Sequence, residues 1–502
     1  MQRLRSFPIG KSIFASGPSK IPAASFWEAQ FLPGWLPIFL GAALGIASAF
    51  LIVKGLWTAL IPLAIIVPLG ILFLTYPFVA LMIWMLVFPY IVRIPQVAGR
   101  IPYNLLHRAI IPGALVLVIL SDWLRIRKRE PVRFGRADLV MLLFLGWVIA
   151  NIVLFSPDTT HSLIRFYDRY IIPFCVYWLI RLIAPTARDL QRFLPIAFIT
   201  IIAEAVIGMI GIFAPQALPQ EWVREGIERG LGSLGNPSVY TSTLIFCALL
   251  LLQYAVQGRS RLLRAVCLLT FGLTYLCVFL SFSRGAWLGG SLVLLGLMFV
   301  YPKVVVRLLA IGLTVMLVLG TTILAQQIAF AYVRLNTVET VQGRILGGAK
   351  SVQMIVNKPF FGWGYDTYDL YDEEFRTRVA NLATDQQKTS HNTYLTLMAE
   401  TGIPALILYV LPILWWLKLS RKVWRRLPQT GFFSWHLLVM LWLLILNFFT
   451  VSSFMDMLRF NLFGTTVWWM ALGLIANLVY PYIRPGDIGI PRWLHPPKRE
   501  TS

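Results

Sequence analysis

A polar interval from 325 to 390 ends in HNTYLTLMAETGIP, residues 391–404, and this stretch leads into an apolar block. The interval carries charges, amides and glycines, whereas the sequence on both sides of it runs in long apolar blocks. A connection of about 65 residues between membrane spans is too long for a simple turn, and long connections usually carry function. We therefore expect this interval to form the working face of an integral membrane protein, with His391 at the membrane surface.

The composition is that of a polytopic helical membrane protein. Of the 502 residues, 58% are hydrophobic and 13% are charged, and the mean hydropathy is +0.72. Soluble proteins are nearer half apolar and about a quarter charged. Apolar runs of about 20 residues, the length that a helix needs to cross a bilayer, recur along the chain. The predicted fold class is all-α: a transmembrane helical bundle of about 12–14 spans, with one large loop that contains short helices.

Hydropathy divides the chain into five parts. We expect a basic cytoplasmic tail at 1–30, transmembrane helices over 31–324, a large extracytoplasmic loop at 325–392, further transmembrane helices over 393–480 and a cytoplasmic tail at 481–502. The candidate spans are 35–53, 56–74, 78–92, 109–124, 138–155, 170–183, 194–214, 239–256, 262–280, 286–300, 304–324, 393–417, 435–451 and 460–480. No cleavable signal peptide is evident in the basic tail, since it has no long apolar core.

The distribution of basic residues predicts the orientation of these spans. With the first tail in the cytoplasm, alternation places nearly every basic cluster on the cytoplasmic side, as the positive-inside rule requires. These clusters lie at 125–136, 181–192, 259–264, 303–307, 418–426 and 492–499. The same alternation places 93–108, 156–170, 215–238, 281–285 and 325–390 outside. These outer stretches contain arginines, which the positive-inside rule does not account for. Binding of an anion on the outer side would explain why arginines are present there.

The formal net charge of +22 does not indicate nucleic-acid binding, because the basic residues sit in short loops between spans. An anionic lipid or a lipid-linked phosphate is the partner that such loops favour. The four cysteines, Cys175, Cys247, Cys267 and Cys277, lie in apolar blocks without a CxxC pair, so we expect packed free thiols.

Three outer arginines are candidate anion ligands. Arg284 lies in the short turn SFSRG, residues 281–285, where small residues would let a ligand approach the backbone. Arg344 follows Gly343 in the polar interval, and Arg229 opens the glycine-rich stretch RGLGSLGNP, residues 229–237. The alternatives are a snorkelling arginine at 284 and a plain glycine-rich turn at 229, because the P-loop spacing is absent.

The rest of the polar interval offers weaker signals. Apolar residues at roughly helical spacing from Ile345 to Val356 predict an amphipathic helix on the outer leaflet. The aromatic stretch PFFGWG, residues 359–364, suits either a sugar ring or a hydrophobic plug that holds the loop on the membrane. The acidic residues from Asp366 to Glu374 match no metal-binding spacing, and we interpret them as a solvated helix face.

His391 is the candidate general base. It sits at the predicted outer end of a span, next to Asn392 and about two and a half turns before Glu400. The ordinary pKa of imidazole, near 6.5, suits proton abstraction from a hydroxyl group. A lone histidine is more often structural, so this assignment depends on its surroundings.

These segments together resemble the O-antigen ligase and polymerase superfamily. The resemblance covers roughly 195–475 and is carried by SFSRGAW at 281–287, Gly343-Arg344, PFFGWG at 359–364, HNTYL at 391–395 and ETGIP at 400–404. His391, Asn392 and Gly402 fit the ligase signature, whereas Ala405 stands where the family often has glycine. Fourteen spans exceed the twelve usual for the ligases, and the first 130 or so residues match only as generic spans.

The resemblance implies a membrane glycosyltransferase of the GT-C type, acting in lipopolysaccharide or polysaccharide biosynthesis at the outer face of the bacterial cytoplasmic membrane. The implied donor is a glycan on undecaprenyl pyrophosphate, and the acceptor is a lipid A–core sugar or a similar glycan. It implies no nucleotide sugar, ATP or metal. Arg284, Arg344 and Arg229, with Asn392, would bind substrate, and His391 would act as base in one inverting displacement.

Two other functions fit parts of the sequence. A polymerase of the same superfamily would use a second lipid-linked repeat as acceptor. A small-anion transporter of the bicarbonate type would need a polar path through the bundle, and the predicted spans hold few charges, of which Glu204 and Asp456 are the clearest. The superfamily's proteins once named inorganic-carbon transporters tend to lack the His-Asn pair, so its presence favours the transferase.

Overall fold

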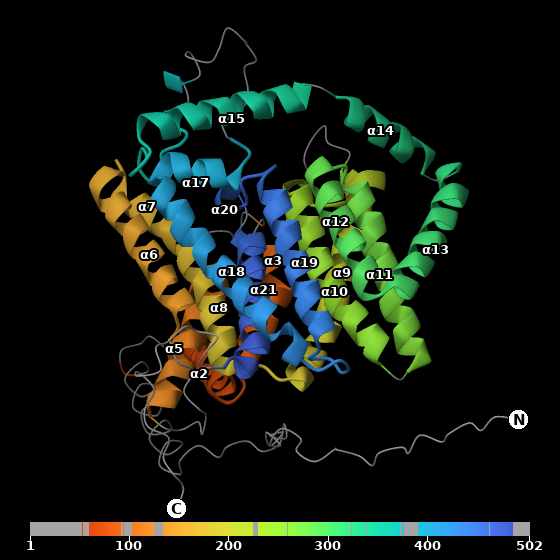
Figure 1. Ribbon diagram of the computed structural model, residues 1–502, viewed down its shortest axis with the longest axis horizontal. Coiled ribbons are helices and arrows are strands. Elements are labelled where there is room, and N and C mark those ends of the chain that lie inside the picture. The colour runs from red at the N-terminus through yellow and green to blue at the C-terminus, as the bar shows by residue number, and fades with distance from the viewer. Residues whose placement is uncertain are drawn as a thin grey trace, which may run out of the picture.

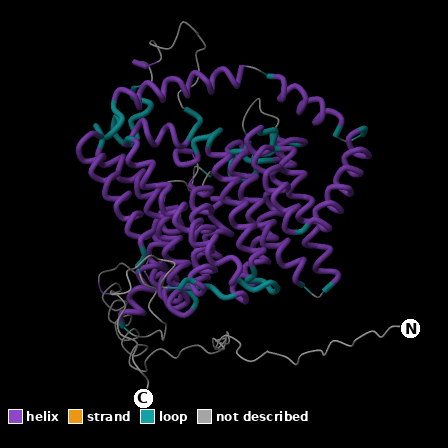
Figure 2. The backbone as a smooth tube through the Cα atoms, viewed as in Figure 1, coloured by secondary structure: helices purple, strands orange, loops and turns teal. Residues whose placement is uncertain are grey.

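The computed structural model is an all-helical bundle, and two further helices, α14 (Ala325–Asn336) and α15 (Glu339–Asn357), lie across one of its ends (Figure 1). It describes residues 53, 60–91, 94, 103–124, 134–223, 229–258, 260–322, 324–337, 339–371, 374–375, 390–460 and 462–484. Helices dominate this part of the chain, and no strand occurs in it (Figure 2). The predicted fold class, a polytopic helical membrane protein, is confirmed.

The helices follow one another with short connections. In the first half they are α2 (Leu60–Thr75), α3 (Phe78–Ile91), η2 (Asn104–Ala109), α5 (Ile110–Trp123), α6 (Arg136–Phe155), α7 (Thr159–Phe166), η3 (Tyr167–Ile171), α8 (Ile172–Ile183), α9 (Ala187–Phe213), η4 (Pro215–Ala217) and η5 (Gln220–Trp222). In the second half they are α10 (Pro237–Gln257), α11 (Arg261–Leu280), α12 (Arg284–Val300), α13 (Pro302–Gly320), α14 (Ala325–Asn336), α15 (Glu339–Asn357), α17 (Thr393–Thr401), α18 (Ile403–Val423), η6 (Trp424–Arg426), α19 (Trp435–Ser452), α20 (Met457–Phe460), α21 (Leu462–Val479) and η7 (Tyr480–Tyr482).

Nine helical segments of the described chain are long and apolar enough to cross a membrane, and each overlaps a predicted span. The predicted spans 78–92 and 286–300 form helices shorter than 18 residues, α3 and α12. The predicted span 56–74 corresponds to α2, which is described from Leu60, and 170–183 is the end of a continuous helical run, 159–183, made of α7, η3 and α8. The predicted span 35–53 and both predicted tails lie outside the described residues, apart from Val53 and 481–484.

Burial separates central helices from peripheral ones. The most apolar windows of α10 and of the α21 segment are each 89% buried, so these helices form the core of the bundle. The corresponding window of α13 is 6% buried, which leaves its apolar side chains for lipid. Close packing of α8 on α21, α19 on α12 and α6 on α18 completes the bundle.

Short polar side chains start the helices at the face that carries the polar interval. Asn236 caps α10 by accepting from the backbone N–H groups of Ser238 and Val239, and Pro237 follows at the first helical position. Ser283 caps α12 in the same way. The two caps lie side by side, because the hydroxyls of Ser238 and Ser283 are 3.1 Å apart. The predicted outer stretches around 236 and 283 therefore meet in space.

Helices α14 and α15 lie across this face (Figure 1). The predicted amphipathic helix is present as part of α15, with Ile345 and Val356 exposed and Met354 buried against Tyr368 and Ala399. Both helices are longer than the short helices that we expected in this loop. Helix α15 packs against α17 at this end of the bundle.

The predicted span 393–417 is wrong, because this stretch forms two helices instead of one. The sequence predicts a single span over 393–417, but the structure breaks it into the short helix α17 and the span α18. Gly402 between them has φ of +85°, a conformation that stops a helix and that side chains other than glycine rarely adopt. Pro404 then begins the new helix within its first turn. The result places α17 at the surface beside α15.

Candidate active site

Arg284 is the first residue of α12, directly after the capping Ser283. Its guanidinium reaches the end of α14, where Nε donates to the carbonyl of Arg334 at 2.9 Å and Nη2 donates to the carbonyl of Thr337 at 2.6 Å. A second bond joins Nη2 to the Arg334 carbonyl. The start of a membrane helix is thereby tied to the chain that leads into α15.

This tie gathers three guanidinium groups. Burial lowers the pKa of Arg344, and the positive charges of Arg284 and Arg334 lower it further. Burial and the charge of Arg284 likewise lower the pKa of Arg334, whose Nε is buried without a hydrogen-bond partner. Within the described residues, no ion pair joins any of the three to a carboxylate. Like charges held together without a counterion are costly, and such a cluster favours binding of a multiply charged anion.

An apolar cavity of about 360 Å³ adjoins the arginine cluster (Arg284, Arg334 and Arg344). Ala331 and Leu335, which lie on α14 close to Arg334, line it together with Trp287, which lies one helical turn after Arg284. Its remaining walls come from Tyr275, Val278, Phe279, Gly290, Ser291 and Leu294 of α11 and α12. A charged head group at the arginines and an apolar tail in this cavity would occupy neighbouring positions.

Arg229 lies near the cluster, but its side chain takes a different direction. The N–H of Gly230 donates to the carbonyl of Leu280 at 3.0 Å, which fixes the glycine-rich stretch beside the turn that precedes Arg284. Arg229 itself lines a separate small cavity with Trp222 and Ile207. The structure thus brings Arg284 and Arg344 together and sets Arg229 against α9.

Glu204 holds this glycine-rich stretch from within α9. Its carboxylate accepts from the backbone N–H of Ser233 at 2.8 Å and is also bonded to the Ser233 hydroxyl. Gly232 has φ of +57°, and a methyl group there would overlap this carboxylate. Glu204, which the sequence offered as a polar group on a transport path, therefore has a structural task.

His391 occupies a strained position at the entrance of α17. Its φ is +50°, in the left-handed region that costs a residue other than glycine about 1 kcal/mol or more. Asn392 stabilises this turn, since its side-chain oxygen accepts from the N–H groups of Tyr394 and Leu395 at 2.9 and 3.1 Å. Its amide nitrogen donates to the carbonyl of Ser453 at 3.2 Å. Asn392 thus orients the residue before it, and both ends of its amide contact the chain.

The turn at 453–455, between α19 and α20, connects the two halves of the site. On one side it receives the amide of Asn392, and the carbonyl of Met455 accepts from the hydroxyl of Thr393 at 3.0 Å. On the other side Phe454 packs against the backbone of Gly285, where its Cβ lies 3.2 Å from the place that a Cβ of residue 285 would take. The loop of His391 and the turn of Arg284 therefore flank the same three residues.

The aromatic stretch 359–364 packs as a plug. Phe361 stacks on Trp147 of α6 with ring centroids 5.2 Å apart, and the Nζ of Lys358 lies 3.9 Å from the ring centroid of Trp363. Backbone bonds from Trp363 and Gly364 to the carbonyls of Ala399 and Glu400 fasten the stretch to the end of α17. Of the two interpretations of this stretch, the geometry favours anchoring over sugar stacking.

The part of the chain that carries the arginine cluster and His391 matches a known protein family. Residues 265–410 match the family of O-antigen ligases. The matched range includes Arg284, Arg334, Arg344 and His391, and it lies within the range of the resemblance seen in the sequence. It supports the O-antigen ligase and polymerase superfamily and a glycosyltransferase-like enzyme of polysaccharide biosynthesis. A comparison with curated proteins gives no match.

The O-antigen ligase match ends just beyond Gly402, which the fold requires to be glycine. With φ of +85°, a methyl group at this position would overlap the carbonyl oxygen of Phe360. We expect Gly402→Ala to lower the unfolding free energy by roughly 2 kcal/mol or more, since strain and overlap add. Thermal unfolding in detergent measures the loss.

Gly431→Ala is the matched control for this prediction. Gly431 also has a positive φ, +92°, but a Cβ there meets nothing within 4 Å. Its replacement should cost less, because only the backbone strain applies. Equal losses of melting temperature for the two variants would contradict the packing of 359–364 against Gly402.

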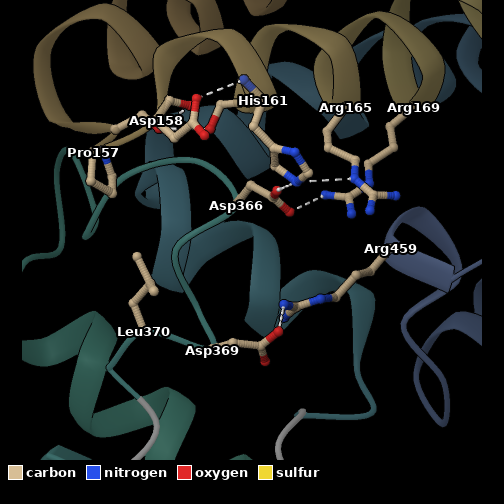
Figure 3. A pocket seen from close by; sticks show the side chains of 11 residues that line it. Pro157, Asp158, His161, Arg165, Arg169, Asp366, Asp369, Leu370 and Arg459 are labelled. Atoms are coloured by element: carbon tan, nitrogen blue, oxygen red, sulfur yellow. Dashed lines mark hydrogen bonds and ion pairs between the residues drawn. The ribbon is translucent and has the colours of Figure 1, made fainter.

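Asp366 and Asp369 do not lie on the solvated helix face that the sequence predicted, whereas Glu374 of the same cluster is helical and exposed. Asp366 forms an ion pair with Arg169 of η3 at 2.7 Å, and Asp369 pairs with Arg459 of α20 (Figure 3). Asp366 has φ of +63° and lies in a loop. Ion pairs with Arg169 and Arg459, which are distant in the sequence, determine the position of these aspartates, and the local run of acidic residues does not. Asp372 and Glu373 of the same cluster lie outside the described residues.

Glu400 is buried beneath this loop at the end of α17. Its Oε1 accepts from the backbone N–H of Tyr368 at 3.2 Å. Burial raises its pKa to about 7, against the lowering effects of Arg459 and Arg169, and the carboxylates of Asp366 and Asp456 add to the rise. The neutral form of Glu400 is thus favoured in the folded protein.

This raised pKa predicts a pH dependence of stability. The folded state binds the Glu400 proton more tightly than the unfolded state, so its contribution is complete below about pH 4.5 and is lost as the pH rises through about 7. Glu400→Gln should reduce this slope, because the amide keeps an acceptor for Tyr368 and does not titrate. Melting temperatures from pH 5 to pH 8 test it, and parallel curves for both proteins would refute it.

The sequence did not single out Arg334, Arg165, Arg169 or Arg459. Arg334 carries no local motif, and its part in the cluster comes from the contact of Arg284 with its carbonyl. A signal did exist for Arg165 and Arg169, since their spacing of four residues places both on one face of a helix that enters a span.

Proposed function

We propose that this protein transfers a glycan from undecaprenyl pyrophosphate to an acceptor hydroxyl at the outer face of the bacterial cytoplasmic membrane, as an O-antigen ligase does. The observation that carries the proposal is the arginine cluster at the head of an apolar cavity. A pyrophosphate needs several cationic donors, and a polyprenyl tail needs an apolar surface open to the membrane. The arginine cluster and the apolar cavity, both within residues 275–344, support this mode of binding.

The arginines have two tasks in this reaction. Before transfer they hold the pyrophosphate of the donor, so that its first sugar faces His391. As the bond between the anomeric carbon and the phosphate oxygen breaks, negative charge grows on that oxygen and the guanidinium groups stabilise it. Fixed charges aimed at developing charge commonly contribute more to catalysis than any other single effect. In this proposal the arginines do the work that a metal ion does in other glycosyltransferases.

His391 takes the remaining task. It removes the proton from the acceptor hydroxyl while the acceptor oxygen attacks the anomeric carbon, and undecaprenyl pyrophosphate leaves from the opposite side. One displacement inverts the configuration at that carbon. The positive φ of His391 supports this role, since strain of this kind occurs where a side chain must be held for function.

A reconstituted reaction tests the proposal. The purified protein receives an undecaprenyl-pyrophosphate-linked oligosaccharide with a fluorescent label, with or without lipid A–core. Labelled lipid A–core that appears only when both substrates are present supports ligation. A ladder of lengthened glycans without lipid A–core would identify the polymerase of the same superfamily. If neither labelled lipid A–core nor a ladder were formed, the proposal would be contradicted.

A further inference from the structure

Figure 3 shows the lining of a second, polar cavity of about 460 Å³. Its size lies in the range of small-ligand pockets, about 300–1,000 Å³. The lining comes from the start of α7, the loop after the aromatic plug and α20. Its ionisable residues are Asp158, His161, Arg165, Arg169, Asp366, Asp369 and Arg459.

The charges of this cavity are only partly matched. Asp366 is shared by Arg169 and by His161, whose Nε2 lies 3.5 Å from it, and Asp369 is paired with Arg459. Arg165 is exposed, and its hydrogen bond runs from Nε to the ring of His161 at 3.4 Å. Its guanidinium lies next to that of Arg169 on the cavity wall (Figure 3).

Arg169 is the buried guanidinium of this wall, and its Nη1 donates to Asp366 at 2.7 Å. The residue is 5% exposed, and its buried Nε has no hydrogen-bond partner. The carboxylate of Asp158 accepts from the backbone N–H of His161 as a helix cap, at 2.9 Å. Three carboxylates and three guanidinium groups line the cavity. Asp366 and Asp369 pair with Arg169 and Arg459 and Asp158 caps α7, so Arg165 is the guanidinium of this lining for which the described residues show no carboxylate partner.

The cavity and the arginine cluster lie on opposite sides of α17 and α20. Helix α7 stands at one side of the bundle, α12 and α14 stand at the other, and α17 and α20 lie between them (Figure 1). The cavity is also linked to both ends of α17. Tyr368, in the loop of Asp366, is bonded to Glu400 at the end of this helix, and the N–H of Met457 in α20 donates to the Thr393 hydroxyl at its start, at 2.9 Å.

We propose that this cavity is the acceptor subsite and that it binds an acidic sugar of the acceptor glycan, through a carboxylate or phosphate group held by Arg165 and Arg169. The inference rests on the proposed glycan transfer, because it assigns the second substrate of that reaction. Neighbouring guanidinium groups suit a carboxylate or phosphate, and the paired aspartates offer acceptors for sugar hydroxyls. The donor and the acceptor would then approach α17 from different sides.

Binding measurements with two probes test the subsite. The first probe is the acidic core oligosaccharide released from lipid A, and the second is undecaprenyl pyrophosphate without sugar. Arg165→Ala should weaken binding of the oligosaccharide about tenfold or more, since a charge-assisted hydrogen bond is lost, and Arg165→Glu should abolish it. Binding of undecaprenyl pyrophosphate should stay within about twofold in both variants.

Thr160→Ala is the matched control, because Thr160 is exposed on the same helix and does not line the cavity. Oligosaccharide binding that is unchanged in both Arg165 variants, or equally weakened in Thr160→Ala, would overturn the inference. Absence of oligosaccharide binding to the unaltered protein would overturn it as well. If the unaltered protein failed to bind undecaprenyl pyrophosphate, the proposed function itself would fail, so the two failures can be told apart.

Discussion

Replacing His391 by alanine should slow glycan transfer by about 100- to 10,000-fold, the contribution typical of a general base. This factor corresponds to a rise of about 3 to 5 kcal/mol in the activation barrier. The loss should appear in kcat, with undecaprenyl pyrophosphate binding retained, because the arginine cluster is unchanged. Initial rates of the reconstituted reaction and binding of the lipid pyrophosphate measure the two quantities.

His391→Asn is the sharper variant of this experiment. Alanine at φ of +50° adds backbone strain, whereas asparagine adopts the left-handed region several-fold more readily. Asparagine keeps the turn but has no basic nitrogen, so His391→Asn should melt near the unaltered protein and be as inactive as His391→Ala. A nearly normal rate in either variant would exclude His391 as the base.

The spans could be predicted from sequence because a bilayer imposes a length and an apolar composition on a helix. Helix α10 extends over Pro237–Gln257, where the sequence predicts 239–256. The alternation of spans also grouped 215–238, 281–285 and 325–390 on one face, and the structure has the starts of α10 and α12 together with α14 and α15 at one end of the bundle (Figure 1). The hydropathy of about 20 consecutive residues is therefore enough to predict where a span lies.

What the sequence could not provide depends on contacts between distant segments. The break at Gly402 is decided by the carbonyl of Phe360, which occupies the space beside it. Asp366 is held by Arg169, which lies 197 residues earlier, so its local acidic pattern misled the interpretation. The membership of Arg334 in the cluster likewise follows from how α14 folds back over Arg284.

The arginine cluster predicts a conflict between stability and binding. The pKa of Arg344 is lowered, so the folded protein disfavours its cation, and removing that charge should relieve repulsion from Arg284 and Arg334. Arg344→Ala should therefore keep or raise the melting temperature while it weakens undecaprenyl pyrophosphate binding by about tenfold or more. Few substitutions would give this combination, since most destabilise.

Arg284→Lys separates charge from geometry in the same cluster. Lysine keeps the positive charge but lacks the planar fork through which Nε and Nη2 donate together to the carbonyl of Arg334, so the end of α14 should be held less firmly and lipid binding should fall. Arg192→Ala serves as the control, because Arg192 is exposed near the start of α9 and pairs with Asp189 there. If Arg284→Lys, Arg344→Ala and Arg192→Ala all bound undecaprenyl pyrophosphate normally, the guanidinium groups would not be its ligands. Normal binding by Arg284→Lys with loss in Arg344→Ala would instead show that Arg344 carries the contact and that the fork of Arg284 is dispensable.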